Sequence, residues 1–167
     1  MKLTSSEANK LLKSYNDELT RVTTLETQSF SFKASINEKI EDVRPEYNFK
    51  STQNTIDDLE FKIINLKHCI NMFNTTTKLP CGLTIDEALV KLPMLNKQLN
   101  KLKGYISKLP KTRCSGGWSN NSIVEYEYIN YDIKEVKDAY NKTSELVNKI
   151  QLELDNANNT LTIEVED

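Results

Sequence analysis

Cations and aromatic side chains gather in two polar stretches of the sequence. Residues 110–131 contribute Lys111, Arg113, Trp118 and Tyr126, and residues 29–50 contribute Arg44, Tyr47 and Phe49. Guanidinium and ammonium groups bind phosphate or carboxylate, and aromatic faces stack on planar rings and cations. These residue types predict a site for a small anionic, nucleotide-like ligand, with Arg44 and Arg113 holding the charge. The alternative is that the aromatic residues cover the end of the fold or contact another subunit.

A second candidate anion site lies in the loop that precedes a predicted helix. Its hydroxyl, amide and glycine residues are Asn74, Thr75, Thr77, Gly82 and Thr84. The first N–H groups of a helix have no partner within the helix and attract anions. The competing interpretation, which we favour, is that these residues cap two helices and turn the chain.

Catalytic and metal-binding patterns are absent from the sequence. The single histidine, His68, adjoins Cys69 on a predicted helix, where neighbouring positions do not face each other. The three cysteines, Cys69, Cys81 and Cys114, do not have the spacing of zinc ligands. We therefore expect no enzyme, no metal and no cofactor. The odd cysteine count and an N-terminus without a secretory signal favour a cytoplasmic protein with reduced thiols.

Apolar residues recur at alternating steps of three and four, which is typical of amphipathic helices. The clearest run is Ile56, Leu59, Ile63, Leu66, Ile70 and Phe73. We expect one domain, 1–167, with helices at about 6–28, 52–73, 85–109 and 132–157. Ser5 or Ser6 is expected to cap the first helix. Thr84 and Glu87 form a capping box at the start of the third, and Pro110 ends it.

Two segments alternate apolar or aromatic with polar residues and predict short strands, at about 123–130 and 161–165. Neither has an evident partner, so we expect them to join small sheets or another subunit. An up-and-down helix path places segments 29–50 and 110–131 at the same end of the bundle. That arrangement is what brings the two cation-aromatic groups together in the predicted ligand site.

Several stretches carry a family resemblance that extends over nearly the whole chain. They are Asn71–Thr77 followed by Gly82–Leu89, Tyr47–Phe49, Leu109–Arg113 and Ser122–Ile133. Together they resemble a largely uncharacterised, mostly clostridial bacterial family, sometimes labelled septicolysin-like. Many of its members end in an Asn-Trp-Thr-Thr type of motif, where this chain has Asn158-Asn-Thr-Leu161. The resemblance implies a helical, oligomeric, cytosolic protein and implies no reaction.

The charge balance narrows the function classes. A net charge of −2 with 28% charged residues disfavours binding of extended nucleic acid and of membrane surfaces. We expect a mainly α protein, an antiparallel long-helix bundle or coiled coil with short β additions, that forms a homo-oligomer. Its expected function is non-enzymatic binding of the small anionic ligand, in one version as a phage or mobile-element protein that sequesters a signalling nucleotide. The alternative is a structural or protein-interaction coiled-coil scaffold without a small ligand.

Overall fold

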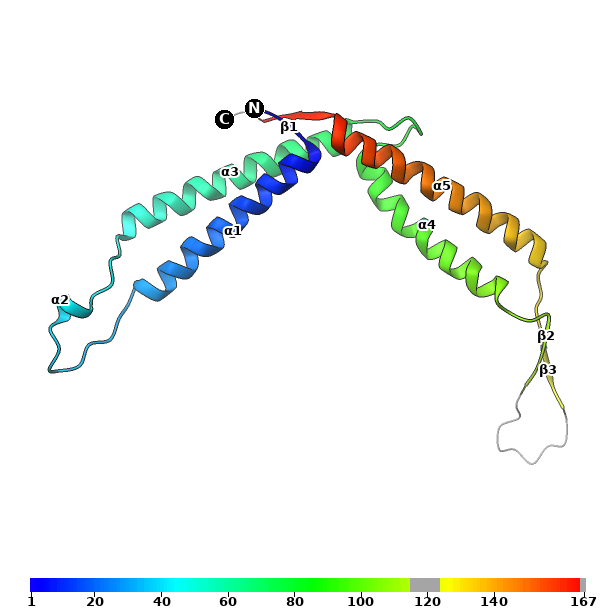
Figure 1. The fold of residues 1–167 in the computed structure, drawn as a ribbon, viewed down its shortest axis with the longest axis horizontal. Helices are drawn as coiled ribbons and strands as arrows, with labels where there is room; N and C mark the ends of the chain where they lie inside the picture. Colours follow the sequence, from blue (N-terminus) through cyan, green and yellow to red (C-terminus); the bar gives the residue numbers. More distant parts are fainter. Residues whose placement is uncertain (115–123, 166–167) are drawn as a thin grey trace. The chain divides into compact units, whose positions relative to one another are not determined.

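The computed structural model describes residues 1–114 and 124–165 and is mainly α (Figure 1). Its helices are α1 (Ser5–Ser29), α2 (Ile40–Val43), α3 (Phe49–Thr76), α4 (Ile85–Ile106) and α5 (Ile133–Thr160). Its strands are β1 (Lys2–Thr4), β2 (Lys111–Arg113), β3 (Tyr126–Tyr128) and β4 (Thr162–Glu164). The chain divides into two compact units, one of Met1–Thr77 with Asp155–Asp167, the other of Lys78–Leu154.

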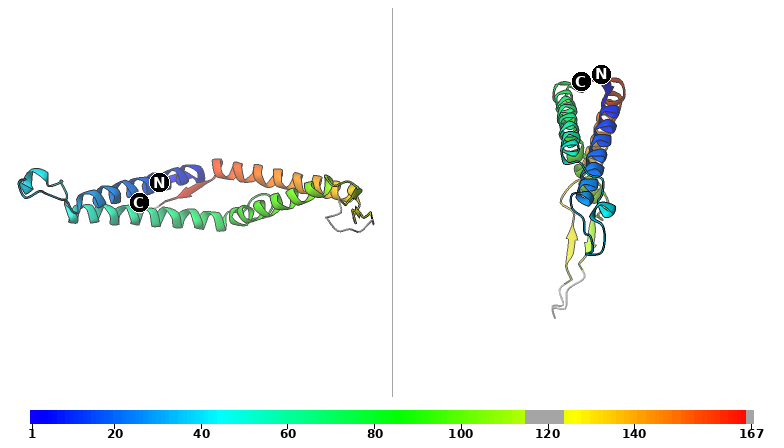
Figure 2. Two further views of the ribbon diagram at one scale, coloured as in Figure 1. Left: turned by 90° about the horizontal axis from the view of Figure 1, so that it is seen from below. Right: turned by 90° about the vertical axis from the view of Figure 1, so that its left-hand side faces the viewer.

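In the first unit α1 and α3 form an antiparallel pair, side by side in Figures 1 and 2. Buried Leu66 and Ile70 of α3 pack with Ala8 of α1, because a spacing of four residues keeps them on one helix face. The core is completed by Ile163 and Val165 from the C-terminal segment. Strand β4 lies antiparallel to β1, so the two ends of the chain close over this core.

The start of α1 differs from the prediction. The cap is Thr4, not Ser5 or Ser6: its hydroxyl accepts a hydrogen bond from the Glu7 N–H at 3.2 Å. The Glu7 carboxylate in turn accepts from the Thr4 N–H at 2.8 Å, which completes a capping box. These contacts lower the pKa of Glu7, chiefly through the hydrogen bond from the Thr4 backbone.

In the second unit α4 and α5 run side by side, with the β2–β3 hairpin in the connection between them (Figures 1 and 2). Ile85, Ala88 and Leu92 are buried on α4, at steps of three and four. On α5, Val147, Ile150 and Leu154 are buried with the same steps. The predicted capping box of Thr84 and Glu87 is confirmed, and α4 continues through Pro93.

The mainly α fold with short β additions is confirmed, and each long helix begins and ends within three residues of its predicted bounds. The helix predicted at 85–109 is α4, which ends at Ile106 instead of Leu109, with Ser107 as its cap. Both predicted strands exist in shorter form, and Ile123 lies outside the described residues. Their partners, β1 and β2, were not predicted.

Over the described residues, no helix combines the length and the apolar character that crossing a membrane requires. The same residues contain no group of three or more His, Cys, Asp or Glu side chains arranged to hold a metal ion.

Candidate functional site

The β2–β3 hairpin brings part of the predicted cation-aromatic site together. Lys111 lies opposite Tyr128, and Arg113 lies opposite Tyr126. Residues directly opposite in an antiparallel pair, and residues two apart on one strand, share a face. Lys111, Arg113 and the two tyrosines therefore form one face, the hairpin face, and all four are exposed.

Lys111 makes cation–π contacts with the two tyrosines of the hairpin face. The Lys111 ammonium lies 4.0 Å from the ring centroid of Tyr126 and 5.4 Å from that of Tyr128. A cation over a ring is held there by the negative face of the π system. A planar ligand can stack on the same side of Tyr126 only if Lys111 moves aside. Arg113 forms no ion pair with any described residue.

A pair of tyrosines holds the base of the hairpin. The rings of Tyr105 and Tyr131 stack with centroids 5.2 Å apart, and the Tyr131 hydroxyl donates to the Tyr105 carbonyl at 2.7 Å. Lys108 pairs with Glu127 on the other side of the hairpin at 3.1 Å. The pKa of Lys108 is raised, first by this hydrogen bond and then by the charge of Glu127. These contacts fix the strands relative to α4 and α5.

The predicted residues of segment 29–50 belong to the other unit. Trp118 is outside the described residues. Arg44, Tyr47 and Phe49 belong to the first unit, whereas Lys111, Arg113 and Tyr126 belong to the second. The Arg44 guanidinium is 3.3 Å from the Glu41 carboxylate and 5.9 Å from the Phe32 ring centroid.

Segment 29–50 is attached to the first unit at one point and is otherwise mostly exposed. The Tyr47 hydroxyl donates to Oε1 of Glu26 at 2.8 Å, and the Gln53 amide donates to the same oxygen at 2.6 Å. Desolvation, followed by this contact with Glu26, raises the pKa of Tyr47. Phe49 is exposed at the start of α3. Tyr47 is therefore the residue that holds this segment against the helices.

The protein's own groups occupy the second candidate anion site. The Cys81 N–H donates to Oε2 of Glu153 at 2.8 Å, and the Thr84 N–H donates to Oε2 of Glu87 at 2.8 Å. Gly82 makes the turn with a φ of 88°. At the end of α3, the Thr75 hydroxyl donates to the Asn71 carbonyl, the Thr77 N–H donates to the Phe73 carbonyl, and Asn74 is half-buried. These contacts support the capping interpretation.

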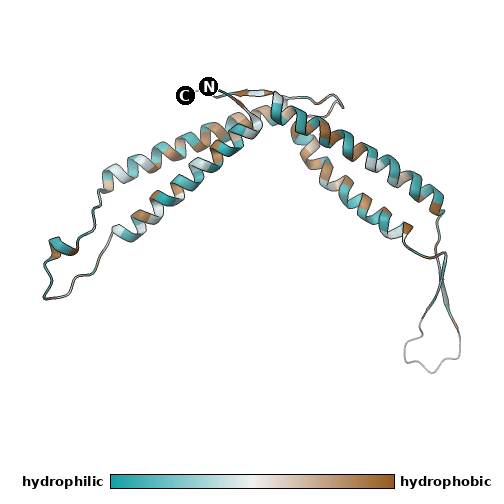
Figure 3. Cartoon of the chain, in the orientation of Figure 1, coloured by the Kyte–Doolittle hydropathy of each residue, from teal (hydrophilic) through white to brown (hydrophobic). Residues whose placement is uncertain are grey.

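The helices also expose apolar residues that the predicted stripes did not include. On α3, Phe61 is 63% exposed, Ile64 65% and Met72 50%. On α4, Val90 and Met94 are also exposed, and apolar residues recur along both helices (Figure 3). The signal was present in the sequence, because Phe61 and Ile64 stand beside the stripe that was used to predict the helix.

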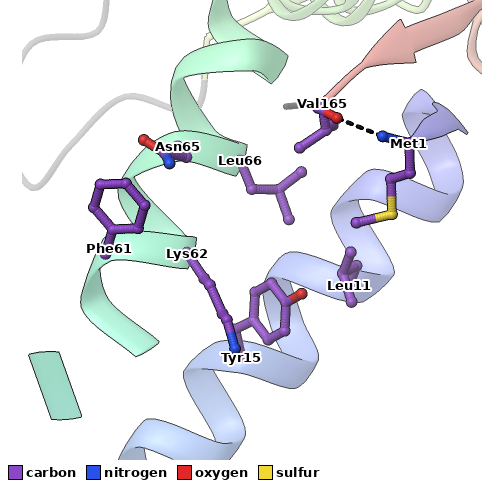
Figure 4. Close-up of a pocket in the computed structure, with 8 residues that line it drawn as sticks. All are labelled: Met1, Leu11, Tyr15, Phe61, Lys62, Asn65, Leu66 and Val165. Carbon is purple, nitrogen blue, oxygen red and sulfur yellow. Dashed lines mark hydrogen bonds between the residues drawn. The ribbon is translucent and has the colours of Figure 1, made fainter. Parts of the chain in front are cut away.

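A small apolar pocket of about 190 Å³ adjoins Phe61 in the first unit (Figure 4). It is lined by Met1, Leu11, Tyr15, Phe61, Lys62, Asn65, Leu66 and Val165. The N-terminal amine of Met1 donates to the Val165 carbonyl at its edge. On the same helix His68 is exposed, whereas Cys69 packs against the core, so the two side chains lie on different faces.

Comparisons with known proteins supply a fold and no activity. No protein-family model matches the sequence, and no curated protein matches it. One solved structure, described as a functionally unknown conserved protein from Corynebacterium diphtheriae, is similar, with a TM-score of 0.58 and 16% sequence identity. The match covers 98% of this chain and 100% of that one. At this identity the likeness shows that the two proteins share a fold over their whole length.

Proposed function

We propose that the protein is a non-enzymatic interaction module whose paired helices bind protein partners through exposed apolar faces. The observation that carries this proposal is the exposure of Phe61 and Ile64, 63% and 65%, one turn apart on α3. Clustered exposed apolar residues are uncommon on soluble monomers and mark interaction surfaces. Met94 of α4 is exposed to the same degree, 65%.

Contacts in the loops also favour an interaction module, because several groups that could bind an anionic ligand are already paired within the protein. Glu153 and Glu87 occupy the N–H groups before α4, and Arg44 pairs with Glu41. The proposal places the protein in the cytoplasm, a reducing compartment, because Cys69, Cys81 and Cys114 are all free thiols.

Site-specific photo-crosslinking in living cells tests this function. A benzophenone amino acid replaces Phe61 in one variant and Met94 in another, and Lys13, an exposed polar residue of α1, in a matched control. We expect covalent protein adducts from the two apolar positions and few from position 13. Equal yields at all three positions, or no adducts at any of them, contradict the proposal.

A second candidate function is binding of a small anionic, nucleotide-like ligand at the hairpin face, as a sequestering protein of a phage or mobile element. The specific observation in its favour is that two cations, Lys111 and Arg113, share a face with two tyrosines. Arg113 has no acidic partner among the described residues. Its guanidinium can bind a phosphate without first breaking an ion pair.

Thermal unfolding in the presence of nucleotides and cyclic dinucleotides tests this second function. A ligand at about 100 times its dissociation constant adds roughly 2.7 kcal/mol of stability. We expect Arg113→Ala to weaken binding about tenfold or more, through the lost charge-assisted hydrogen bonds. The matched control is Lys108→Ala, which removes a cation already paired with Glu127. No stabilisation by any nucleotide, or equal effects of the two variants, rejects this function.

A further inference from the structure

The exposed face of α3 carries charges as well as apolar residues, and their order suits a second copy of the same chain. We infer that two copies pair through this face, α3 against α3, antiparallel and related by a two-fold axis. This inference rests on the proposed interaction function and names the partner.

Helix α3 has two apolar faces. The first, with Leu59, Leu66 and Ile70, is buried within the unit. The second, the outer face, contains Phe61, Ile64 and Met72, which are at least half exposed. Steps of three and eight residues bring these three side chains within one side of a helix with 3.6 residues per turn. The apolar pocket beside Phe61 extends this surface to Leu11 and Tyr15 of α1 (Figure 4).

Acidic and basic residues flank the outer face in a fixed order. Glu60 and Lys67 are seven residues apart, close to two helical turns, so they lie on the same flank about 10.5 Å apart along the axis. Both are exposed, and neither forms an ion pair with any described residue. On the same face, Asp57 precedes Phe61 and His68 follows Ile64.

This order is self-complementary only in the antiparallel arrangement. In a two-fold interface, if residue i contacts residue j of the second copy, then j also contacts i. An axis between Phe61 and Ile64 places Glu60 beside Lys67 of the second copy and Lys67 beside its Glu60. The same axis places Asp57 near His68 of the second copy and joins the apolar residues at the centre. In a parallel pair each flank faces the opposite flank of the second copy, so Glu60 and Lys67 do not meet.

Charge reversal at two exposed positions tests the inference without disturbing the core. Sedimentation equilibrium is measured for the full chain, for Glu60→Lys, for Lys67→Glu, and for an equal mixture of the two variants. We expect the native chain to dimerise and each variant to dissociate with a dissociation constant about tenfold higher, because two ion pairs become two repulsions. The mixture should regain the native affinity, since the two lysines of one variant then face the two glutamates of the other. The double variant should also dimerise.

The matched controls are Lys13→Glu and Asp17→Lys, which make the same charge changes on exposed positions of α1. They should leave the dissociation constant unchanged, and helical circular dichroism should be native for every variant. A monomeric native chain overturns the inference, as does a dimer that Glu60→Lys and Lys67→Glu leave intact, or a mixture that fails to recover. The proposed interaction function fails separately, when photo-crosslinking at positions 61 and 94 gives no more protein adducts than at position 13.

Discussion

Glu153 of α5 holds the loop before α4, because its Oε2 accepts the Cys81 N–H at 2.8 Å although the residues are 72 positions apart. The pKa of Glu153 is lowered, first by a hydrogen bond from the Cys81 side chain, then by the backbone N–H and the nearby charge of Lys149. A carboxylate from within the chain thus takes the position at which the sequence suggested an external anion. The contact ties two distant segments of the second unit together.

Replacing Glu153 with Gln should reduce the free energy of unfolding at neutral pH. The lowered pKa means that the folded state favours the ionised carboxylate, so this contribution is present above the ordinary Glu pKa of 4.5. It is lost as the pH falls through the lower pKa of the folded state. The unfolding free energies of the native chain and Glu153→Gln in urea should therefore differ at neutral pH, and the difference should shrink as the pH falls through the lowered pKa of Glu153.

The control for this measurement is Glu145→Gln, a substitution on the exposed surface of the same helix. It should leave the unfolding free energy nearly unchanged at neutral pH. A Glu153→Gln variant that matches this control at neutral pH shows that the contact with Cys81 contributes nothing to stability.

Replacing Thr4 with Ala should destabilise the first unit by about 1 kcal/mol, the usual cost of removing a side-chain cap. The variant leaves the Glu7 N–H without its acceptor, and the Glu7 carboxylate loses the hydroxyl contact at 3.0 Å. The matched control is Thr24→Ala, whose hydroxyl only donates to the Thr20 carbonyl within the same helix. Denaturant unfolding should show Thr24→Ala as neutral or slightly stabilising, because Ala is the better helix former. Equal losses from both variants contradict the role of the cap.

The long helices were predictable because their apolar periodicity is a local property of the sequence. The cap of α1 was equally local: Thr4 has Glu7 three residues later, a capping-box spacing that neither Ser5 nor Ser6 offers. Strand β2 was missed for a different reason. Its three residues, Lys111–Arg113, carry no strand pattern and become a strand only through pairing with Tyr126–Tyr128.

The candidate site was predictable only in part. Lys111, Arg113 and Tyr126 meet because they flank one short connection between helices. The link from Cys81 to Glu153 depends on two segments that are distant in sequence, and residue spacing gives no sign of it. The two units divide between Thr77 and Lys78, at the turn before α4, and again between Leu154 and Asp155, within α5.

Replacing Leu66 and Ile64 with Ala, one at a time, should distinguish the buried face of α3 from its exposed outer face. Leu66 is 1% exposed and packs in the core with Ala8 and Ile70. Leu66→Ala should cost about 2–5 kcal/mol, through lost burial and the cavity left behind. Ile64→Ala, two positions away on the outer face, should change the unfolding free energy of the monomer by less than about 0.5 kcal/mol.

Chemical unfolding at protein concentrations below the dimer dissociation constant measures both variants on the monomer. Sedimentation equilibrium should then show the opposite ranking for association, with Ile64→Ala weakening the dimer. A large loss of monomer stability from Ile64→Ala would show that this side chain belongs to the core of its own unit.

Replacing Tyr131 with Phe should loosen the base of the hairpin. The variant keeps the ring stacked on Tyr105 and removes only the hydroxyl that donates to the Tyr105 carbonyl at 2.7 Å. Loss of one such bond at an exposed site should cost about 0.5–1 kcal/mol. Amide hydrogen exchange should rise at Ile129, two residues before Tyr131 in the chain, whose N–H donates to the Pro110 carbonyl. The control is Tyr128→Phe, in which the hydroxyl has no hydrogen-bond partner among the described residues. Both variants retain their aromatic rings. Faster exchange at Ile129 in Tyr131→Phe alone therefore assigns the effect to the hydrogen bond with Tyr105. Equal exchange in both variants shows that this hydrogen bond does not hold the hairpin.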